Sequence, residues 1–468
     1  MNAGMMLPVL PSLFTNPDSP ALLIDKGSTE VLGAVMIAAL GAAYALPAFV
    51  AQPVLGQLAD RFGRKKLLVA AFSGSVLSYV LFAAGIMMES IPLLIGSRAV
   101  DGITGANVLV AQAAVADMTE EGERTRYFGY FTGALSVGFV LGPLLGGWLG
   151  APDGPSWTGP AVAFWGAAAL NLLVVLVFAW QFKETLGEDE RDTDEDFETA
   201  RAFTNAKEAF GDGERRPYYL VLFLYAAGYT FFTTFYSVVL EDRVGMETQA
   251  VGTYFAVLGA GFAVVQLFLV DRLQNRFGAG KTLWLALFAT AASLVVAGLA
   301  TAPWMAYAVI PLFALGNGLV EPLVTSLIST SAGGREQGRV QGVRGSVDAL
   351  GRVGPPFLSA PLASLGSPVW PVLAGAGVMA AGGAVALRFL GKGEDEPDDD
   401  EPDDDPESHD PESAPEASGD GAATPGDTPE ASATADGGGG ASGARRAPAR
   451  PGGSARCGRR GGAARGRR

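Results

Sequence analysis

Eleven long apolar runs occupy most of the first 390 residues of this 468-residue chain. Each is close to or above the roughly 20 residues that a helix needs to cross about 30 Å of hydrocarbon, whereas a buried strand is only about 4–8 residues long. Charged residues make up 17% of the chain, below the usual quarter or so of a soluble domain. The runs predict an all-α membrane protein with spans at 31–55, 67–88, 91–116, 127–150, 160–182, 218–240, 251–270, 282–300, 304–329, 340–365 and 369–390.

The apolar segment at 1–14 is too short for a further complete span. As a helix it would cover about 21 Å, which is less than the hydrocarbon core of a bilayer. We expect it to be the remaining part of a first span whose beginning is absent, so that the predicted spans number twelve.

Basic residues gather in alternate loops, while the intervening loops are mainly acidic. Cytoplasmic loops of membrane proteins carry the excess of Lys and Arg, so this alternation predicts a multi-pass chain with both termini in the cytoplasm. The basic loops lie at 61–66, 124–126, 183–216, 272–281 and 335–339.

Short motifs repeat between the two parts of the apolar region. The Arg-Phe-Gly triplet at 61–63 recurs at 276–278, and the Gly-Pro pair at 142–143 recurs at 354–355. Internal repeats of this kind are typical of duplicated transporter folds. The repeat predicts two six-helix halves that have arisen from one unit.

The predicted domain boundaries follow from composition. Residues 1–182 and 217–390 form the two halves, and the polar, acidic stretch at 183–216 reads as a cytoplasmic linker. Residues 391–468 are rich first in Asp, Glu and Pro and then in Gly, Ala and Arg. Such a composition cannot bury a core, so we expect a disordered cytoplasmic tail.

Four segments resemble motifs of one transporter family. Residues 56–66 resemble the signature loop between helices two and three of the major facilitator superfamily, and 98–106 resemble its helix-four motif. Residues 138–147 resemble the helix-five antiporter motif, and 4–11 a helix-one motif. Together they resemble the twelve-helix drug:proton antiporters of the tetracycline-efflux branch.

The resemblance implies a fold of two pseudo-symmetric halves and a secondary transporter that works by alternating access. It implies proton-coupled efflux of drugs or small metabolites across the plasma membrane by a monomer, with protons and the lipid bilayer as partners. No cofactor, metal or nucleic acid is expected. The alternatives are an uptake uniporter or symporter for a small metabolite, and a non-transporting membrane sensor on the same fold.

The chain departs from the family pattern at three places. The second copy of the signature loop has Asn275 where the first has Asp60, and Ala279 where the first has Arg64. Glu321 stands where an apolar residue is expected in the tenth span. The acidic residue that the branch commonly carries in its first helix has no counterpart here.

The signature loop predicts a conformational latch. Gly56 and Gly63 permit close packing and a sharp turn between two helices. Asp60, near a helix end, could cap a neighbouring helix such as the eleventh span. Arg64 could pair with Asp117 at the end of the fourth span, as the family's matching residues do. The alternative is an ordinary basic loop that only sets the topology.

Charged residues inside spans are expensive and are functional candidates by default. Arg98 and Asp101 lie three residues apart on one predicted helix, where they can pair. Asp101 could exchange a proton under the influence of Arg98. The alternative is a static ion pair that fixes packing.

A second charged group lies in the tenth and eleventh spans. Arg344, Asp348 and Arg352 recur every fourth residue, so they share one helix face, and Glu321 lies in the preceding span. One hypothesis makes Glu321 or Asp348 a proton- or cation-binding site, and another has Arg344 bind an anionic group of the substrate. The alternative is a buried network that holds the halves together.

The fifth span carries glycines at every fourth position. Gly138, Gly142 and Gly146 would clear one helix face for close approach, Pro143 would kink the helix, and Gly147 follows. The resemblance makes this the seam of an antiporter. Plain helix packing is the alternative.

Candidate substrate contacts are aromatic or amide side chains inside spans. An aromatic stripe in a cavity can stack on flat or cationic molecules, although it can equally pack against a helix, and amides can bond a ligand or a neighbouring helix. These residues are Tyr225, Tyr229, Phe232, Tyr236, Asn107, Gln112 and Asn317.

Enzyme classes find little support in the sequence. The chain has no phosphate-binding Gly-x-x-x-x-Gly-Lys loop, and its apolar region has neither histidine nor cysteine for a metal. The Gly-rich stretch at 142–147 lies inside an apolar span, so it is not a dinucleotide loop. Secondary transport is the function that remains.

Overall fold

The computed structural model describes residues 2–105, 107–119, 124–151, 159–187, 198, 200–331 and 337–390. The predicted tail at 391–468 and most of the acidic stretch of the linker, 188–197, lie outside these ranges. Within them the chain is helical and contains no strand. The described part is therefore all-α, as predicted.

The helices are numbered in chain order. The first half contains α1 (Asn2–Met6), α2 (Leu10–Phe14), α3 (Ala34–Phe62), α4 (Arg64–Met87), α5 (Ile91–Thr104), α6 (Asn107–Asp117), α7 (Arg124–Leu149) and α8 (Ala161–Gln181), with short turns of helix at η1 (Lys26–Ser28) and η2 (Thr29–Gly33). Then follow α9 (Arg201–Gly211), α10 (Arg216–Val238), η4 (Val239–Arg243), α11 (Thr248–Phe268), α12 (Val270–Phe277), α13 (Ala279–Leu299), α14 (Pro303–Thr330), α15 (Gln337–Ala363) and α16 (Val369–Phe389).

Ten helical segments in the described ranges are long and apolar enough to cross a membrane. They match the eleven predicted complete spans apart from the one at 340–365. Its helix, α15, has 27 residues and packs against α3, α10 and α16. Neighbouring helices rather than lipid surround much of α15, which is why it tolerates its row of charges. The protein is a multi-pass membrane protein.

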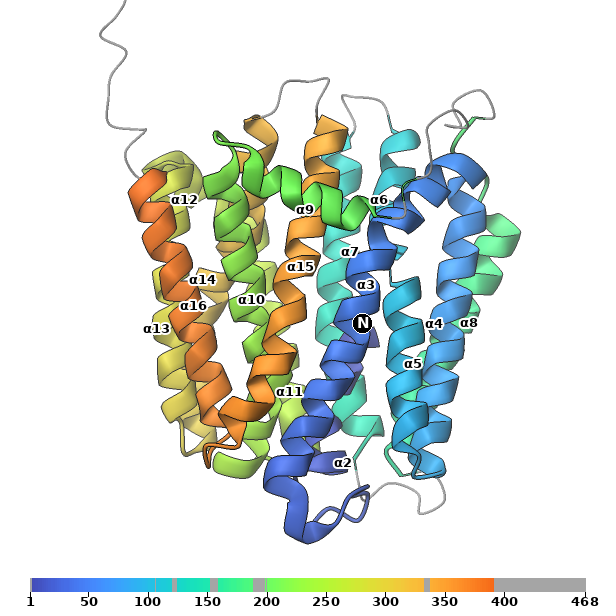
Figure 1. Cartoon of the computed structure of the whole chain (residues 1–468), viewed down its shortest axis with the longest axis vertical. Coiled ribbons are helices and arrows are strands. Elements are labelled where there is room, and N and C mark those ends of the chain that lie inside the picture. Colours follow the sequence, from blue (N-terminus) through green and yellow to red (C-terminus); the bar gives the residue numbers. More distant parts are fainter. Residues whose placement is uncertain are drawn as a thin grey trace, which may run out of the picture. The chain divides into compact units, whose positions relative to one another are not determined.

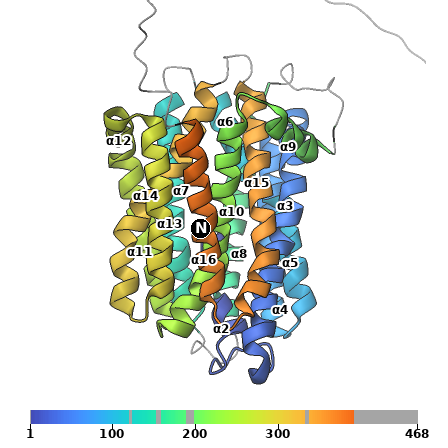
Figure 2. The ribbon, with the colours of Figure 1, turned by 60° about the vertical axis from the view of Figure 1, so that its left-hand side comes forward.

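The two predicted halves meet along two seams. Figures 1 and 2 show the long helices running side by side; α3 of the first half packs against α15 of the second, and α7 packs against α11. In the second seam, a Cβ at Gly147 would come within 2.9 Å of the Cα of Gly252. Only glycine permits this approach of two backbones.

The N-terminal segment differs from the single helix expected there. It forms two short helices, α1 and α2, with a turn between them that contains Pro8. Its side chains are well buried, with Met5 and Leu13 fully so. A Cβ at Gly146 would overlap the backbone of Met5, so the segment lies directly on α7.

The predicted fourth span is interrupted, since α5 ends at Thr104 and α6 begins at Asn107. Residue 106, the last position of the helix-four motif, lies outside the described ranges. The backbone amide of Gly105 bonds the carbonyl of Gly102, which tightens the last turn of α5. The span is therefore made of two helical segments, α5 and α6.

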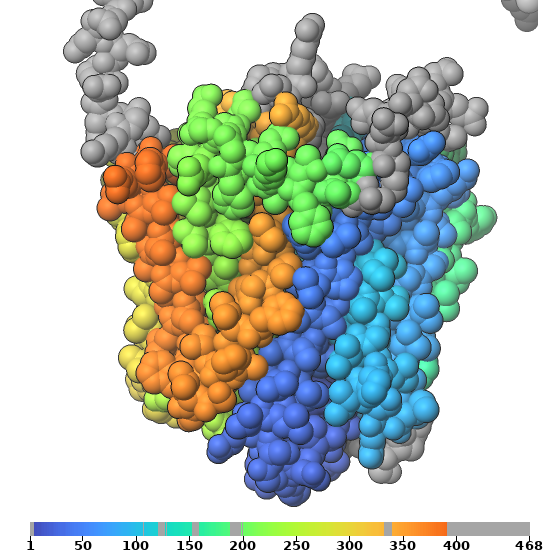
Figure 3. Space-filling model, viewed as in Figure 1, coloured from blue at the N-terminus to red at the C-terminus, as the bar shows by residue number. Residues whose placement is uncertain are grey.

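Helix α9 lies within the stretch predicted to be a linker. It crosses the end of the bundle at an angle to the spans (Figures 1 and 3). Its Ala202 is buried between Phe49 of α3 and Ala349 of α15. The Asn205 amide donates to the Ser346 hydroxyl at 3.0 Å. Contacts with both halves, absent from any local sequence signal, stabilise this helix.

Candidate functional site

A central cavity of about 400 Å³ lies between the two halves. It draws on α1, α2, α3, α5, α7, α10 and α15, so neither half could form it alone. Leucine, isoleucine and alanine side chains make up the apolar part of its wall. The polar and aromatic part consists of Tyr44, Gln52, Arg98, Phe139, Tyr229, Thr230, Thr233, Thr234, Asp348 and Arg352.

The ion pair on the first-half side is enclosed. Arg98 Nη1 lies 2.5 Å from Asp101 Oδ2, and the two side chains are only 9% and 10% exposed. The guanidinium carbon also lies 4.6 Å from the centre of the Tyr44 ring, a distance typical of cation–π attraction. Arg98 reaches the cavity wall, whereas Asp101 lies behind it.

The ion pair on the second-half side is open to the cavity. Arg352 donates two hydrogen bonds to Asp348, from Nε at 2.9 Å and from Nη2 at 3.0 Å. The side chains are 34% and 29% exposed, and both line the cavity. This bidentate geometry is the strongest form of such a pair, yet a ligand or water can still reach it.

Glu321 and Arg344 form a looser pair. Arg344 Nη2 lies 3.6 Å from Glu321 Oε1, and Arg344 Nε donates to the Thr325 hydroxyl at 3.0 Å. The Glu321 side chain is 55% exposed. The four predicted charges of the second half thus form two neighbouring pairs rather than one fully buried network.

The aromatic stripe on α10 divides between the cavity and the core. Tyr229 lines the cavity, and Tyr225 stacks against it. Phe232 and Tyr236 are 1% and 0% exposed; Phe232 packs on Phe313.

Three threonines on α10 were not singled out from the sequence, although they line the cavity. They are Thr230, Thr233 and Thr234. Each hydroxyl donates to a backbone carbonyl of its own helix, so its oxygen lone pairs are what a ligand would meet. Only their position relative to Tyr229 on a common helix could have indicated this role.

The three amide candidates do not line the cavity. Asn107 and Gln112 lie half-buried on α6. Asn317 is buried on α14, and its Oδ1 has no hydrogen-bond partner in the described part of the chain. Asn317 therefore does not use its side-chain oxygen to bond a neighbouring helix within the described residues.

The signature loop brings several charges together. Arg64 Nε lies 3.1 Å from Asp117 Oδ2, the pair expected from the motif, and Arg64 Nη1 lies 2.6 Å from Asp60 Oδ1. Gly63 has φ 99° and ψ 150°, a conformation open essentially to glycine alone. Gly56 lies near Leu109 of α6. Asp60 pairs with Arg64, and the residues just before α15 lie outside the described ranges, so capping of that helix stays a prediction.

Glu184, just after α8, completes the loop and was not identified from the sequence. Its Oε1 accepts the backbone amide of Arg64 at 2.7 Å and that of Lys65 at 3.4 Å. The carboxylate thereby satisfies unpaired amides at the start of α4 and opposes the positive end of the helix dipole. The only signal was an acid at the end of a span, hidden among the many acids of the linker.

The antiporter-motif residues all lie in α7. Gly142, Pro143, Gly146 and Gly147 are buried and Gly138 is half-buried. Gly4 of α1 approaches Pro143.

No group of three or more His, Cys, Asp or Glu side chains in the described ranges could hold a metal ion.

Comparison with known proteins gives a consistent family. The family model described as Major Facilitator Superfamily matches residues 1–356. The class G tetracycline resistance protein of Vibrio anguillarum is 31% identical over 378 residues, covering 79% of this chain and 88% of the relative. Multidrug resistance protein 2 of Bacillus subtilis is 26% identical over 366 residues, covering 76% and 84%.

Solved structures share the fold. A D-xylose–proton symporter superposes with a TM-score of 0.65 at 13% identity, covering 83% of this chain and 95% of the symporter. The human organic anion transporter MFSD10 superposes with a TM-score of 0.59 at 22% identity, covering 82% of this chain and 97% of that structure.

Proposed function

The chain belongs to the Major Facilitator Superfamily, and from this premise we propose that it is a secondary transporter that exports drugs or small metabolites in exchange for protons. The observation that carries the proposal is the central cavity, because its charged and aromatic wall is contributed by both halves. The names of the relatives, tetracycline and multidrug resistance proteins, support export as the direction.

The substrate would bind in that cavity against a mixed wall. Tyr44, Phe139 and Tyr229 offer aromatic faces, and the neighbouring threonines offer hydrogen-bond acceptors. Flat, partly polar molecules suit such a surface. The cavity volume of about 400 Å³ lies within the usual range for small-molecule sites.

Asp348 and Glu321 are the acids that we favour for the exchanged proton. Asp348 lines the cavity and is 29% exposed, and Glu321 is 55% exposed. Each pairs with an arginine, so a proton on either acid would weaken an ion pair. Asp101 is also an acid of the site, but it is paired with Arg98 and its side chain is only 10% exposed. A static role for that pair therefore fits its burial better.

The proposed setting is the plasma membrane, with both termini and the signature loop in the cytoplasm. The basic loops of the sequence support this orientation. Arg64, Asp60 and Asp117 would then form the latch between conformations at the cytoplasmic end. We propose a monomer that acts as a transporter rather than as an enzyme, with no cofactor and no nucleic-acid partner.

The test is dye and drug efflux from cells that express the full chain. A panel of cationic dyes and tetracycline-type drugs is loaded, and efflux is followed before and after a protonophore. We expect efflux that the protonophore abolishes. Uptake of a metabolite instead, or efflux unaffected by the protonophore, would refute proton-driven export.

Two neutral variants then assign the proton. Glu321→Gln and Asp348→Asn each remove a negative charge while keeping the side-chain shape. The variant that removes the coupling acid should lose proton-driven efflux and retain exchange of labelled for unlabelled substrate. Asp271→Asn, at an exposed position on α12, is the matched control and should behave as the parent. Full coupled efflux in both test variants would leave neither acid as the carrier.

A further inference from the structure

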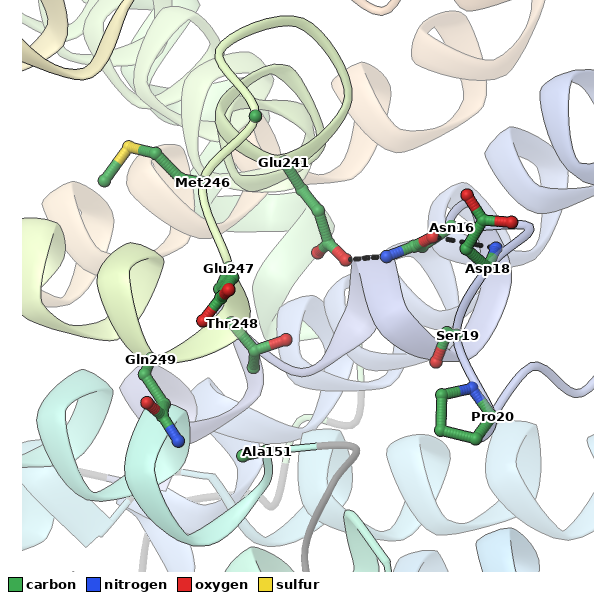
Figure 4. Close-up of a pocket in the computed structure, with 11 residues that line it drawn as sticks. Asn16, Asp18, Ser19, Pro20, Ala151, Glu241, Met246, Glu247, Thr248 and Gln249 are labelled. Atoms are coloured by element: carbon green, nitrogen blue, oxygen red, sulfur yellow. Dashed lines mark hydrogen bonds between the residues drawn. The ribbon is translucent and has the colours of Figure 1, made fainter.

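A hydrogen bond joins the two halves at the end of the bundle opposite the signature loop. Asn16 Nδ2, just after α2, donates to Glu241 Oε1 at 2.6 Å. Glu241 lies in η4, which ends α10. Figure 4 shows the two side chains reaching toward each other from different parts of the chain. The bond must break whenever this end opens.

The Asn16–Glu241 contact stands beside a polar cavity of about 310 Å³. Ser19 and Thr248 line it together with the carboxylates of Asp18 and Glu247. None of the described lining residues is basic. The cavity therefore offers Glu241 no cation in its closed arrangement.

One oxygen of Glu241 is left without a partner. Oε2 is buried and accepts no hydrogen bond from any described residue, while Oε1 accepts the Asn16 amide. A buried carboxylate with one donor is poorly compensated for its lost hydration. A proton on Oε2 would remove the charge and leave Oε1 free to accept from Asn16.

The charged groups around Glu241 are mostly acidic and mostly exposed. Asp242 and Arg243 follow it in η4, and both side chains are exposed. Asp18 and Glu247 line the same cavity, and the negative charge of Glu30 in η2 repels that of Asp242. Opening would hydrate Glu241 among these groups, whereas closing would bury it.

We propose that Glu241 is a proton-sensitive gate residue. With a proton it holds the halves together through Asn16, and without the proton it hydrates and this end opens. The inference rests on the proposed function, since it places this end outside the cell. The proton enters and leaves from the same side, so Glu241 regulates the cycle and carries no net proton across the membrane.

The first test measures opening and requires no substrate. Thr248, in the cavity wall and 3% exposed, is changed to Cys after Cys457, the only cysteine of the chain, is changed to Ser. Labelling by a membrane-impermeant maleimide is followed in cells at about pH 5.5 and about pH 7.5, on either side of the range in which a buried carboxyl titrates.

Glu241→Gln in the same background mimics the neutral side chain and keeps an acceptor for Asn16. Because both proteins carry the same thiol, the ratio of their labelling rates removes the ionisation of the thiol itself. We expect that ratio, parent over Glu241→Gln, to rise about fivefold from the lower to the higher pH, a change of population that a single proton can produce. Asp25→Asn, at an exposed position outside the cavity lining, is the matched control and should follow the parent.

A ratio that stays constant with pH would overturn the proton-sensitive gate. Failure of the proposed function would appear separately, because the labelling requires neither a transported substrate nor net proton flow. The gating position itself has its own test. Asn16→Cys with Glu241→Cys, joined by a short reversible thiol cross-linker, should reduce transport about tenfold or more until a reductant is added. Undiminished transport in the cross-linked protein would exclude a gate here.

Discussion

Two turns at the same end of the molecule are formed by the glycine of an Arg-Phe-Gly triplet. One lies between α3 and α4 and the other between α12 and α13 (Figure 1). The glycines adopt nearly the same backbone, with φ 99° and ψ 150° at Gly63 and φ 79° and ψ 155° at Gly278. The side chains differ, since Asp60 and Arg64 of the first loop correspond to Asn275 and Ala279 of the second.

The comparison separates what the fold needs from what a latch needs. A helix that ends and another that begins within one residue require glycine in both halves. Asp60 and Arg64 have no charged counterparts in the second loop; in the first loop Arg64 binds Asp60 and Asp117 and Glu184 caps α4. Both copies keep the glycine turn, whereas only the first has the residues of the Asp60–Arg64 pair.

The largest effect is expected at the shared glycines. Gly63→Ala puts a Cβ into a conformation that costs about 1–3 kcal/mol, and that Cβ would overlap the Glu184 carboxylate. Gly278→Ala meets the backbone strain in the second loop. We expect Gly63→Ala to destabilise by about 3 kcal/mol and Gly278→Ala by about 2 kcal/mol, measured as thermal unfolding in detergent. Equal losses would show that Glu184 adds nothing to the difference.

Removing the arginine tests whether the charges are a latch. Arg64→Ala leaves Asp117, 22% exposed, and Asp60, 50% exposed, without their cation. Because water screens both acids, we expect a loss of about 1 kcal/mol in stability but a severalfold change in transport rate. Arg64→Lys keeps the charge and should restore part of the rate. If the rate follows stability alone in both variants, the loop is structural.

The cap on α4 should matter somewhat less. Glu184→Ala removes the acceptor for the amide of Arg64, which costs about 1 kcal/mol at this partly buried helix start. Glu184→Gln keeps an acceptor oxygen and should lose less than half as much. Thermal unfolding of the two variants side by side measures the difference. A glutamine variant as unstable as the alanine variant would show that the negative charge, and not the hydrogen bond, stabilises the helix.

The smallest effect is expected from rebuilding the charges in the second loop. Asn275→Asp together with Ala279→Arg recreates a pair four residues apart, worth about 0.3–0.5 kcal/mol at a surface. Residues 322–331, the described end of α14, contain no carboxylate that could take the place of Asp117, so we expect transport not to change. An altered transport rate in this double variant would mean that the second loop can also act as a latch. The two loops would then differ in function only because of the residues at these two positions.

The spans and the signature turn could be predicted because their signals are local. Twenty apolar residues specify a membrane helix without reference to the rest of the chain, and the glycine at 63 is required by its own backbone angles. The approach of Arg64 to Asp117 was available through the resemblance to a known family, because nothing in the spacing of residues 53 positions apart indicates contact.

Features that depend on tertiary packing were missed or left open. Tyr44 lies over Arg98 from a different helix, and Glu184 reaches α4 from beyond α8. On α10, Tyr229 and Phe232 belong to the same periodic stripe, yet one lines the cavity and the other is buried. Periodicity gives the face of a helix but not what lies opposite that face.

The two ends of the helix bundle are held together differently, because only one of them is crossed by α9. It is fastened to α3 through Phe49 and to α15 through Ser346, whereas the far end is fastened by Asn16 and Glu241. When α3 separates from α15 at the end covered by α9, the contacts of α9 with at least one of the two helices must break. Opening at that end should therefore cost more free energy than opening at the other end. We expect opening at the α9 end to be the slower of the two steps. Asn205→Ala should then increase the transport rate. An unchanged rate would show that α9 moves with one half and does not oppose opening.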